Sequence, residues 1–198
     1  MSCLIANGRT EQCKDSISGL QAVYFVNFGI QADDVTYSGV SPDFGDDITA
    51  ISASGANPPI TALYKYELKG ANTFDQAIMS SRENGTTFFE QTLTIQMKRQ
   101  DVATHKNVKF LAYGRPHIVV HTRSNQWFIM GLYEGADVNA GKVSTGTQYG
   151  DFNGYELTFV ANERVPANFL TDGSGNDLAD EAELAALFGL TQADIKDS

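Results

Sequence analysis

Five oxygen-bearing side chains near the end of the chain have the spacing of a calcium-binding loop. They occupy positions 1, 3, 5, 9 and 12 of such a loop, and they are Asp172, Ser174, Asn176, Asp180 and Glu183. The sixth position, which needs glycine for a sharp turn, holds Asp177 instead, and Pro166 argues against a helix just before the loop. The alternative is a flexible linker followed by an acidic helix N-terminus. The sequence gives a calcium candidate but no firm metal site.

The three histidines lack the spacing of a metal site. His117 and His121 are expected on one face of a strand, about 13 Å apart because a strand rises ~3.3 Å per residue. They therefore cannot hold one ion by local geometry, and His105 lies in a different element. We interpret all three as structural residues.

Two further sets of residues have more than one interpretation. Asp43, Asp46 and Asp47 can bind a divalent cation or form a solvated acidic loop, and we favour the loop. Cys3 and Cys13 are too few for a four-ligand zinc site. They are free thiols or, in the minority interpretation, a disulfide that closes an N-terminal loop.

Composition excludes several classes of protein. The net charge of −10 argues against a protein that grips nucleic acid, because phosphate binding needs clustered lysine and arginine. No phosphate loop, dinucleotide fingerprint, nucleophile elbow or metalloprotease helix is present, so we expect no enzyme and no cofactor. The start has no secretion signal, and no apolar run reaches the ~18 residues that cross a bilayer. We expect no membrane partner and a chain made in a cytosol.

Alternating residues predict a mainly β fold. Leu20–Phe28 reads as a strand covered on both faces. Ala62–Lys69 and Phe74–Ser81 are expected to form one arm of a long hairpin, which turns at Asn84-Gly85. In the second arm one face is apolar (Phe89, Leu93, Ile95 and Met97) and the other is polar and contains Thr92, Thr94 and Gln96. That polar face is either the solvated side of a sheet or the lining of a water-filled channel.

The remaining elements complete the expected organisation. Residues 101–113 are predicted to form one flanking helix with a buried stripe, an Asp101 N-cap and Gly114 after its end. Strands are expected at His117–Thr122, Trp127–Tyr133, Lys142–Thr147 and Tyr155–Val160. The domain is expected to span residues 1–170, with an N-terminal arm at 1–19. Residues 171–198 carry seven acidic side chains against one lysine and are expected to be an acidic extension with a short helix at Ala179–Phe188.

The last predicted strand and its flanks carry a resemblance to a known family. Tyr149 to Phe159 contains a Gly-Asp-x-x-Gly turn that leads into an alternating strand, and Glu163 and Pro166-Ala167 complete an E-x-x-P-A stretch. This segment resembles the closing part of bacteriophage major tail (tail-tube) proteins. Residues 132–147 also fit the pattern of these tail proteins, and the opening residues 8–20 resemble related phage virion proteins, whereas residues 171–198 match no pattern of the family.

The resemblance implies a fold, an activity and partners. The fold would be a β-sandwich or half-barrel with one flanking helix. Six copies would form a ring, and stacked rings would make a tube that conducts DNA. Thr92, Thr94 and Gln96 would line the lumen, with Asn84 and Gly85 at the turn of the assembling hairpin. The partners would be copies of the chain, other phage tail proteins and passing DNA, and the location would be the virion tail, assembled in the host cytoplasm.

Other functions fit the same residues. One is another virion position, such as a neck, terminator, baseplate or capsid-decoration protein. Another is a carbohydrate-binding or calcium-binding sandwich module that would use Trp127 and Tyr133. In each of these the chain is a structural or binding protein with no catalytic residues.

Overall fold

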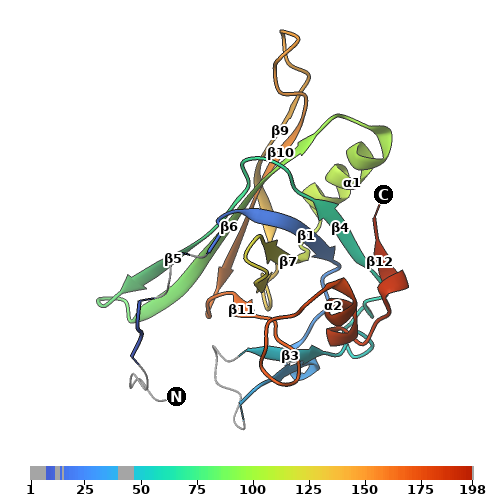
Figure 1. Ribbon diagram of the computed structural model, residues 1–198. Coiled ribbons are helices and arrows are strands. Elements are labelled where there is room, and N and C mark those ends of the chain that lie inside the picture. The colour runs from blue at the N-terminus through green and yellow to red at the C-terminus, as the bar shows by residue number, and fades with distance from the viewer. Residues whose placement is uncertain (1–7, 12–13, 15, 40–46, 198) are drawn as a thin grey trace.

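In the computed structural model, two packed sheets form the centre of the molecule (Figure 1). The structure describes residues 8–11, 14, 16–39 and 47–197. The first sheet has six strands in the order β11-β8-β7-β1-β4-β12. Their bounds are β1 Leu20–Val26, β4 Leu63–Glu67, β7 His117–Thr122, β8 Trp127–Met130, β11 Asn168–Phe169 and β12 Ile195–Lys196.

The second sheet has four strands in the order β5-β6-β10-β9, all antiparallel to their neighbours. Their bounds are β5 Thr73–Ser81, β6 Thr86–Lys98, β9 Asp137–Ser144 and β10 Gly154–Glu163. A small third sheet pairs β2 Val35–Tyr37 with β3 Ile48–Ile51. The helices are α1 Val102–Tyr113, α2 Glu181–Leu187 and the 3-10 turns η1 Ala32–Asp34 and η2 Gln192–Asp194. The predicted mainly β fold with flanking helices is confirmed.

Two apolar cores lie on opposite faces of the six-stranded sheet, because alternate residues of its central strands point to opposite sides. One core fills the space between the two large sheets and includes Phe25, Leu93, Ile95, Leu157 and Phe159. The other lies between the six-stranded sheet and the layer that contains β3 and α2, and includes Tyr24, Trp127, Ile48, Leu184 and Phe188. β1 is buried on both faces, as its sequence predicted.

The long hairpin differs from its prediction in its first arm. Residues 63–67 form β4, which pairs with β1 in the six-stranded sheet, so the hairpin consists of β5 and β6 alone. Gly70, at a φ of 113°, lies in the connection that takes the chain from one sheet to the other. Local alternation is the same for both strands, and only the choice of pairing partner separates them.

The turn at Asn84-Gly85 also differs in detail. A two-residue type I′ turn needs positive φ at both central positions. Of these two residues only Gly85 has it, at 63°, and the last paired residues are Ser81 and Thr86. The hairpin therefore closes with a four-residue loop.

Helix α1 begins as expected, because the Asp101 carboxylate accepts a hydrogen bond from the Thr104 amide at 2.8 Å. The expected buried stripe is wrong, since no residue of α1 is fully buried. Val108 and Leu111 only pack against the edge of the inter-sheet core. Gly114 has an extended conformation, not the left-handed one of a C′ glycine.

Residues after 170 are built into the fold. Leu184 and Leu187 of α2 and its C-cap residue Phe188 belong to the second core, and β12 adds to the six-stranded sheet beside β4. Asp180 caps α2 as a side-chain acceptor. The acidic segment is thus a part of the body that packs through its apolar side.

Candidate assembly surface

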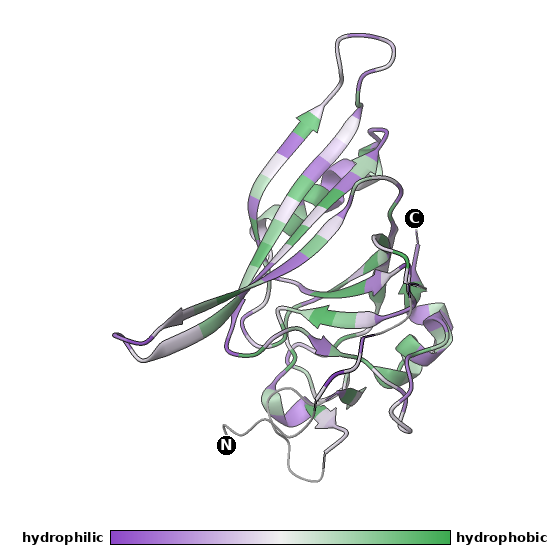
Figure 2. Cartoon of the chain, turned by 60° about the vertical axis from the view of Figure 1, so that its left-hand side comes forward, coloured by the Kyte–Doolittle hydropathy of each residue, from purple (hydrophilic) through white to green (hydrophobic). Residues whose placement is uncertain are grey.

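The outer face of the four-stranded sheet is polar. Thr92, Thr94 and Gln96 alternate with the buried Leu93 and Ile95, so they point away from the core. The pairing register places Thr158 beside Thr94, and their hydroxyls are 3.4 Å apart. Figure 2 shows the alternation of hydrophobic and hydrophilic residues along these strands. The structure therefore gathers the three residues on one open sheet face.

Charges on this outer face are few and slightly negative. The cross-strand register aligns two lysines and four carboxylates with the threonine row. They are Lys98, Lys142, Asp75, Glu90, Asp137 and Glu156. The face is mixed in sign, and it has no basic stripe of the kind that binds nucleic acid.

Both edges of this sheet are open among the described residues of the single chain. Within them β5 pairs only with β6, and β9 pairs only with β10. β9 carries a register irregularity between its pairings with Thr158 and Phe159, which is one of the devices that protect an edge strand. β5 is regular over nine residues and contains no proline or lysine. Such an edge is a template for pairing with another chain.

The β5–β6 hairpin continues beyond the rest of the sheet. β10 covers β6 only from Lys98 to Phe89, so beyond the Ile78–Phe89 pair the hairpin has two strands. This ribbon, taken as residues 78–89 with that pair at its base, projects from the body (Figures 1 and 2). Ile78 is 69% exposed, and Met79 and Phe88 are exposed as well. Ile78 faces Phe89 across the ribbon, and Met79 faces Phe88. A two-stranded ribbon with apolar residues on both faces is only marginally stable in water by itself.

A second projection leaves the opposite end of the sheet. Figure 1 shows the connection between β9 and β10 extending away from the body, and Tyr149 within it is fully exposed. The Asp151 carboxylate accepts hydrogen bonds from the amides of Thr147 and Gln148, each at 2.8 Å, and these bonds lower its pKa. The loop is therefore held in a defined turn that presents the tyrosine.

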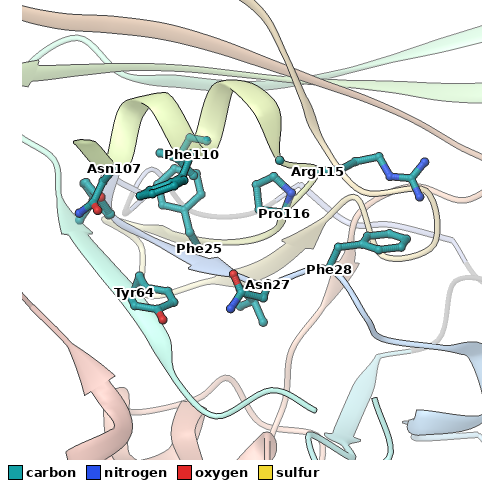
Figure 3. Close-up of a pocket in the computed structure, with 12 residues that line it drawn as sticks. Phe25, Asn27, Phe28, Tyr64, Asn107, Phe110, Arg115 and Pro116 are labelled. Carbon is teal, nitrogen blue, oxygen red and sulfur yellow. The ribbon is translucent and has the colours of Figure 1, made fainter. Parts of the chain in front are cut away.

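An apolar groove of about 530 Å³ lies between α1 and the six-stranded sheet (Figure 3). Phe110 of α1 and Tyr64 of β4 frame it, and Pro116 and Phe28 lie toward its other end. Phe110 is 71% exposed. Tyr64 is exposed, and Tyr66 of the same strand is only half-buried. The sequence signal that could have located this groove is an aromatic residue, Phe110, on the helix that was predicted to have a buried stripe.

Two histidines are structural, in line with their interpretation. His117 is buried, and its Nε2 accepts hydrogen bonds from the amides of Gly29 and Ile30 at 3.1 and 3.2 Å. Its Nδ1–H donates to the Gly131 carbonyl at 2.6 Å, and burial lowers the pKa of the imidazole to about 4. His121 stacks on Trp127 with ring centroids 3.7 Å apart.

Two buried polar residues of the four-stranded sheet hold backbone groups outside it, and the sequence pattern did not predict either of them. Gln91, in the apolar row of β6, accepts a hydrogen bond from the Gly131 amide and donates to the Val165 carbonyl. Glu163 at the end of β10 accepts from the amides of Tyr133 and Glu134 at 2.9 and 2.8 Å. Burial raises the pKa of this carboxyl. Both are almost fully buried, which alternation alone did not indicate.

A cluster of ionisable side chains fixes α2 to the six-stranded sheet. Glu181 accepts a hydrogen bond from the Tyr24 hydroxyl at 3.0 Å and lies 2.6 Å from the Lys65 ammonium. Burial, followed by the nearby Glu181 charge, raises the pKa of Tyr24. These groups hold one another in place, so we assign them a structural role.

The carboxylates among the calcium candidates accept local hydrogen bonds. Asp172 accepts from the amides of Ser174 and Asn176, each at 2.8 Å. Asp180 caps α2, and Glu183 accepts from the Ala179 amide at 2.6 Å. Within the described residues no group of three or more His, Cys, Asp or Glu side chains could hold a metal ion. Asp43, Asp46, Cys3 and Cys13 lie outside the described residues.

The carbohydrate-platform interpretation of Trp127 is wrong. Trp127 has 0% of its surface exposed, and its indole N–H donates to the Leu178 carbonyl at 3.1 Å. A sugar stacks on an open aromatic face, and both faces of this ring are covered. Tyr133 is only partly buried, but the Arg164 guanidinium carbon lies over its ring, 5.5 Å from the ring centroid.

No family model, curated protein or solved structure matches the chain. Among the described residues no helix is long and apolar enough to cross a membrane. The resemblance to tail-tube proteins therefore stays a prediction, and a proposal of function depends on the open sheet, its edges and its ribbon.

Proposed function

We propose that this chain is a structural, non-enzymatic subunit of a bacteriophage tail tube, which assembles with copies of itself into rings that stack into a DNA conduit in the virion. The observation that carries the proposal is the open four-stranded sheet, with its regular, unprotected β5 edge. Such an edge finds partners in another chain unless something covers it.

The strand directions are compatible with a closed ring. Each neighbouring pair in the order β5-β6-β10-β9 is antiparallel, so β5 and β9 run in opposite directions. Copies related by rotation about one axis keep these directions. When β9 of one copy meets β5 of the next, the antiparallel alternation continues without a break, and closure removes every edge of this sheet.

The outer face supports a channel function. If six copies close the ring, as the resemblance implies, their sheets form a barrel of about 24 strands, more than the 16–18 strands that already enclose an aqueous channel in porins. Thr92, Thr94 and Gln96 then line the lumen. The mixed, slightly negative charge of that face gives DNA phosphates no cluster of cations to bind, so a genome slides past it.

The test is electron microscopy of the purified full-length protein, with its mass in solution measured by light scattering. We expect rings and stacked tubes, and a mass that is a multiple of the 21.5 kDa chain. A chain that stays monomeric at high concentration, with no rings on the grids, would refute the proposal. Single rings that never stack would favour a neck or terminator position over a tube.

Cross-linking tests the edge pairing directly. In a background with Cys3 and Cys13 changed to serine, a variant with cysteine at Ala77 of β5 is mixed with one with cysteine at Ala140 of β9. Mixing Asp75→Cys with Ala140→Cys, or Ala77→Cys with Lys142→Cys, tests the registers shifted by two residues in either direction. Facing residues of paired strands have Cβ atoms ~4.5–5.5 Å apart, close enough for a disulfide after small movements. At least one mixture should give a disulfide-linked dimer of the chain.

A further inference from the structure

The described part of the chain leaves two apolar surfaces uncovered at opposite ends of the four-stranded sheet. One is the ribbon of residues 78–89, and the other is the groove beside α1. α1 follows β6 after three residues, at the end of β6 farthest from the ribbon. The Gln100 side chain donates to the Ser144 carbonyl at 2.8 Å, and the Tyr155 hydroxyl donates to the Asp101 carbonyl at 3.1 Å. These bonds fix the start of α1 to the β9–β10 end of the sheet.

The ribbon cannot reach the groove of its own chain. β6 runs from Thr86 to Lys98 between the two sites, and a rise of ~3.3 Å per residue makes it roughly 40 Å long. Figures 1 and 2 show the ribbon and α1 on opposite sides of the body. Any contact between the two surfaces must therefore join different copies.

The two surfaces are complementary in polarity and in charge. Residues 73–90 carry three carboxylates and one arginine, and their exposed apolar side chains include Ile78. Residues 98–115 carry five cationic side chains against Asp101 alone. Both ion pairs in the described part of the chain involve Lys65, so these cations form no ion pair within it. An apolar ribbon on a slightly acidic hairpin thus fits an aromatic groove beside a basic helix segment, of which Arg115 lines the groove.

We infer that the ribbon of one copy docks in the α1 groove of a copy in the adjacent ring, which makes this contact the link between stacked rings. Ile78 and Phe89 lie on the ribbon face that continues the apolar row of the core, and they would pack against Phe110 and Tyr64. Because different patches of the chain meet, the contact is heterologous and repeats without closing, which builds a stack. The inference rests on the proposed ring.

Matched aspartate variants test the contact without disturbing the core. Ile78→Asp and Phe110→Asp both change exposed side chains, so each should fold with an unchanged melting temperature. Each should still form rings, while the fraction of protein that sediments as tubes falls at least about tenfold, because a carboxylate would be buried without a partner. Val102→Asp is the control, since Val102 is 75% exposed on the same helix but does not line the groove. Normal stacking by both groove and ribbon variants would overturn the inference.

Disulfide trapping identifies the occupant. In the background without Cys3 and Cys13, Ile78→Cys protein is mixed with Phe110→Cys protein and oxidised, and we expect a disulfide-linked dimer in the tube fraction. The comparison mixture pairs Phe110→Cys with Ala182→Cys, which lies on the acidic surface of α2. A dimer only in that comparison mixture means that the acidic surface occupies the groove, and the inference fails.

The outcomes separate the two proposals. Tubes without the Ile78–Phe110 disulfide overturn the docking and leave the conduit intact. The disulfide in aggregates that contain no rings supports the docking but overturns the conduit. Monomers with no disulfide overturn both.

Discussion

At the residue scale, Glu163 is a carboxylate whose surroundings only partly suit its charge. Its Oε1 accepts two backbone hydrogen bonds, but the buried Oε2 has no hydrogen-bond partner among the described residues. An unsatisfied buried polar atom costs about 1–3 kcal/mol. Burial is also the largest cause of the raised pKa of this group. Glu163 therefore holds the connection after β8 in place, but its buried charge is incompletely hydrogen-bonded.

Replacing Glu163 by glutamine should therefore stabilise the protein at neutral pH. A raised carboxyl pKa in the folded state means that the contribution of this group to stability is present below the unfolded pKa of about 4.5 and is lost as pH rises through the folded pKa. Glutamine keeps the oxygen that accepts both amides, and its amide nitrogen takes the position of the unpartnered Oε2, so one unsatisfied atom replaces another while the buried charge is removed. We expect E163Q to raise the free energy of unfolding by about 1 kcal/mol at pH 7, measured by urea denaturation.

The pH dependence provides the check on that explanation. The advantage of E163Q should shrink as pH falls toward 4, where the wild-type carboxyl takes up its proton. Glu83→Gln, in the exposed loop at the end of the ribbon, should change stability at neither pH. An advantage that is equal at pH 7 and pH 4 would contradict the titration of Glu163 as its cause.

At the scale of elements, α2 belongs to the core although its sequence is acidic. Its first turn holds Glu181 and Glu183, and its opposite side inserts Leu184 and Phe188 beside β3 and the six-stranded sheet. Charge pattern and apolar pattern describe two faces of one helix. The net charge of residues 171–198 therefore says nothing about whether they pack.

Truncating Phe188 should show this integration. Phe188 is fully buried, so Phe188→Ala should lower the free energy of unfolding by about 3–5 kcal/mol, the usual cost for a core phenylalanine. Thermal melting followed by circular dichroism gives the measurement. Phe110→Ala is the matched control, since the same change on the exposed face of α1 should cost well under 1 kcal/mol. A small effect at both positions would mean that α2 is only loosely attached.

At the scale of the whole molecule, the sign of charge on the open sheet face decides how the proposed channel treats DNA. Thr94→Lys and Gln96→Lys together add two cations per chain to the face that would form the lumen. Tubes of this variant should retain duplex DNA, and the retention should weaken steeply with salt because lysine contacts release counterions. Wild-type tubes should not retain it. Filter binding over a salt series measures both.

A control variant separates the lumen from the outside of the tube. Ala179→Lys with Ala182→Lys adds the same charge at exposed positions near α2, away from the four-stranded sheet. If these two lysines increase DNA retention as much as the pair on β6, the sheet face does not line the path of the DNA.

The sequence by itself determined most of the elements. Period-two alternation located β6 and β10, the cap Asp101 located the start of α1, and the short helix expected at 179–188 is α2. These are local properties, because the residues that decide a strand face or a helix start lie within a few positions of each other. The polar row of Thr92, Thr94 and Gln96 followed from the same alternation.

Only the tertiary structure decided which elements meet. β4 was expected in the hairpin and pairs with β1, the apolar row of α1 faces a groove, and the acidic C-terminal segment completes a core. Each of these outcomes depends on residues tens of positions apart competing for the same partner, and local patterns do not rank such pairings. The open edge of β5 is the same kind of fact, since an edge exists only once every other strand has chosen its neighbours.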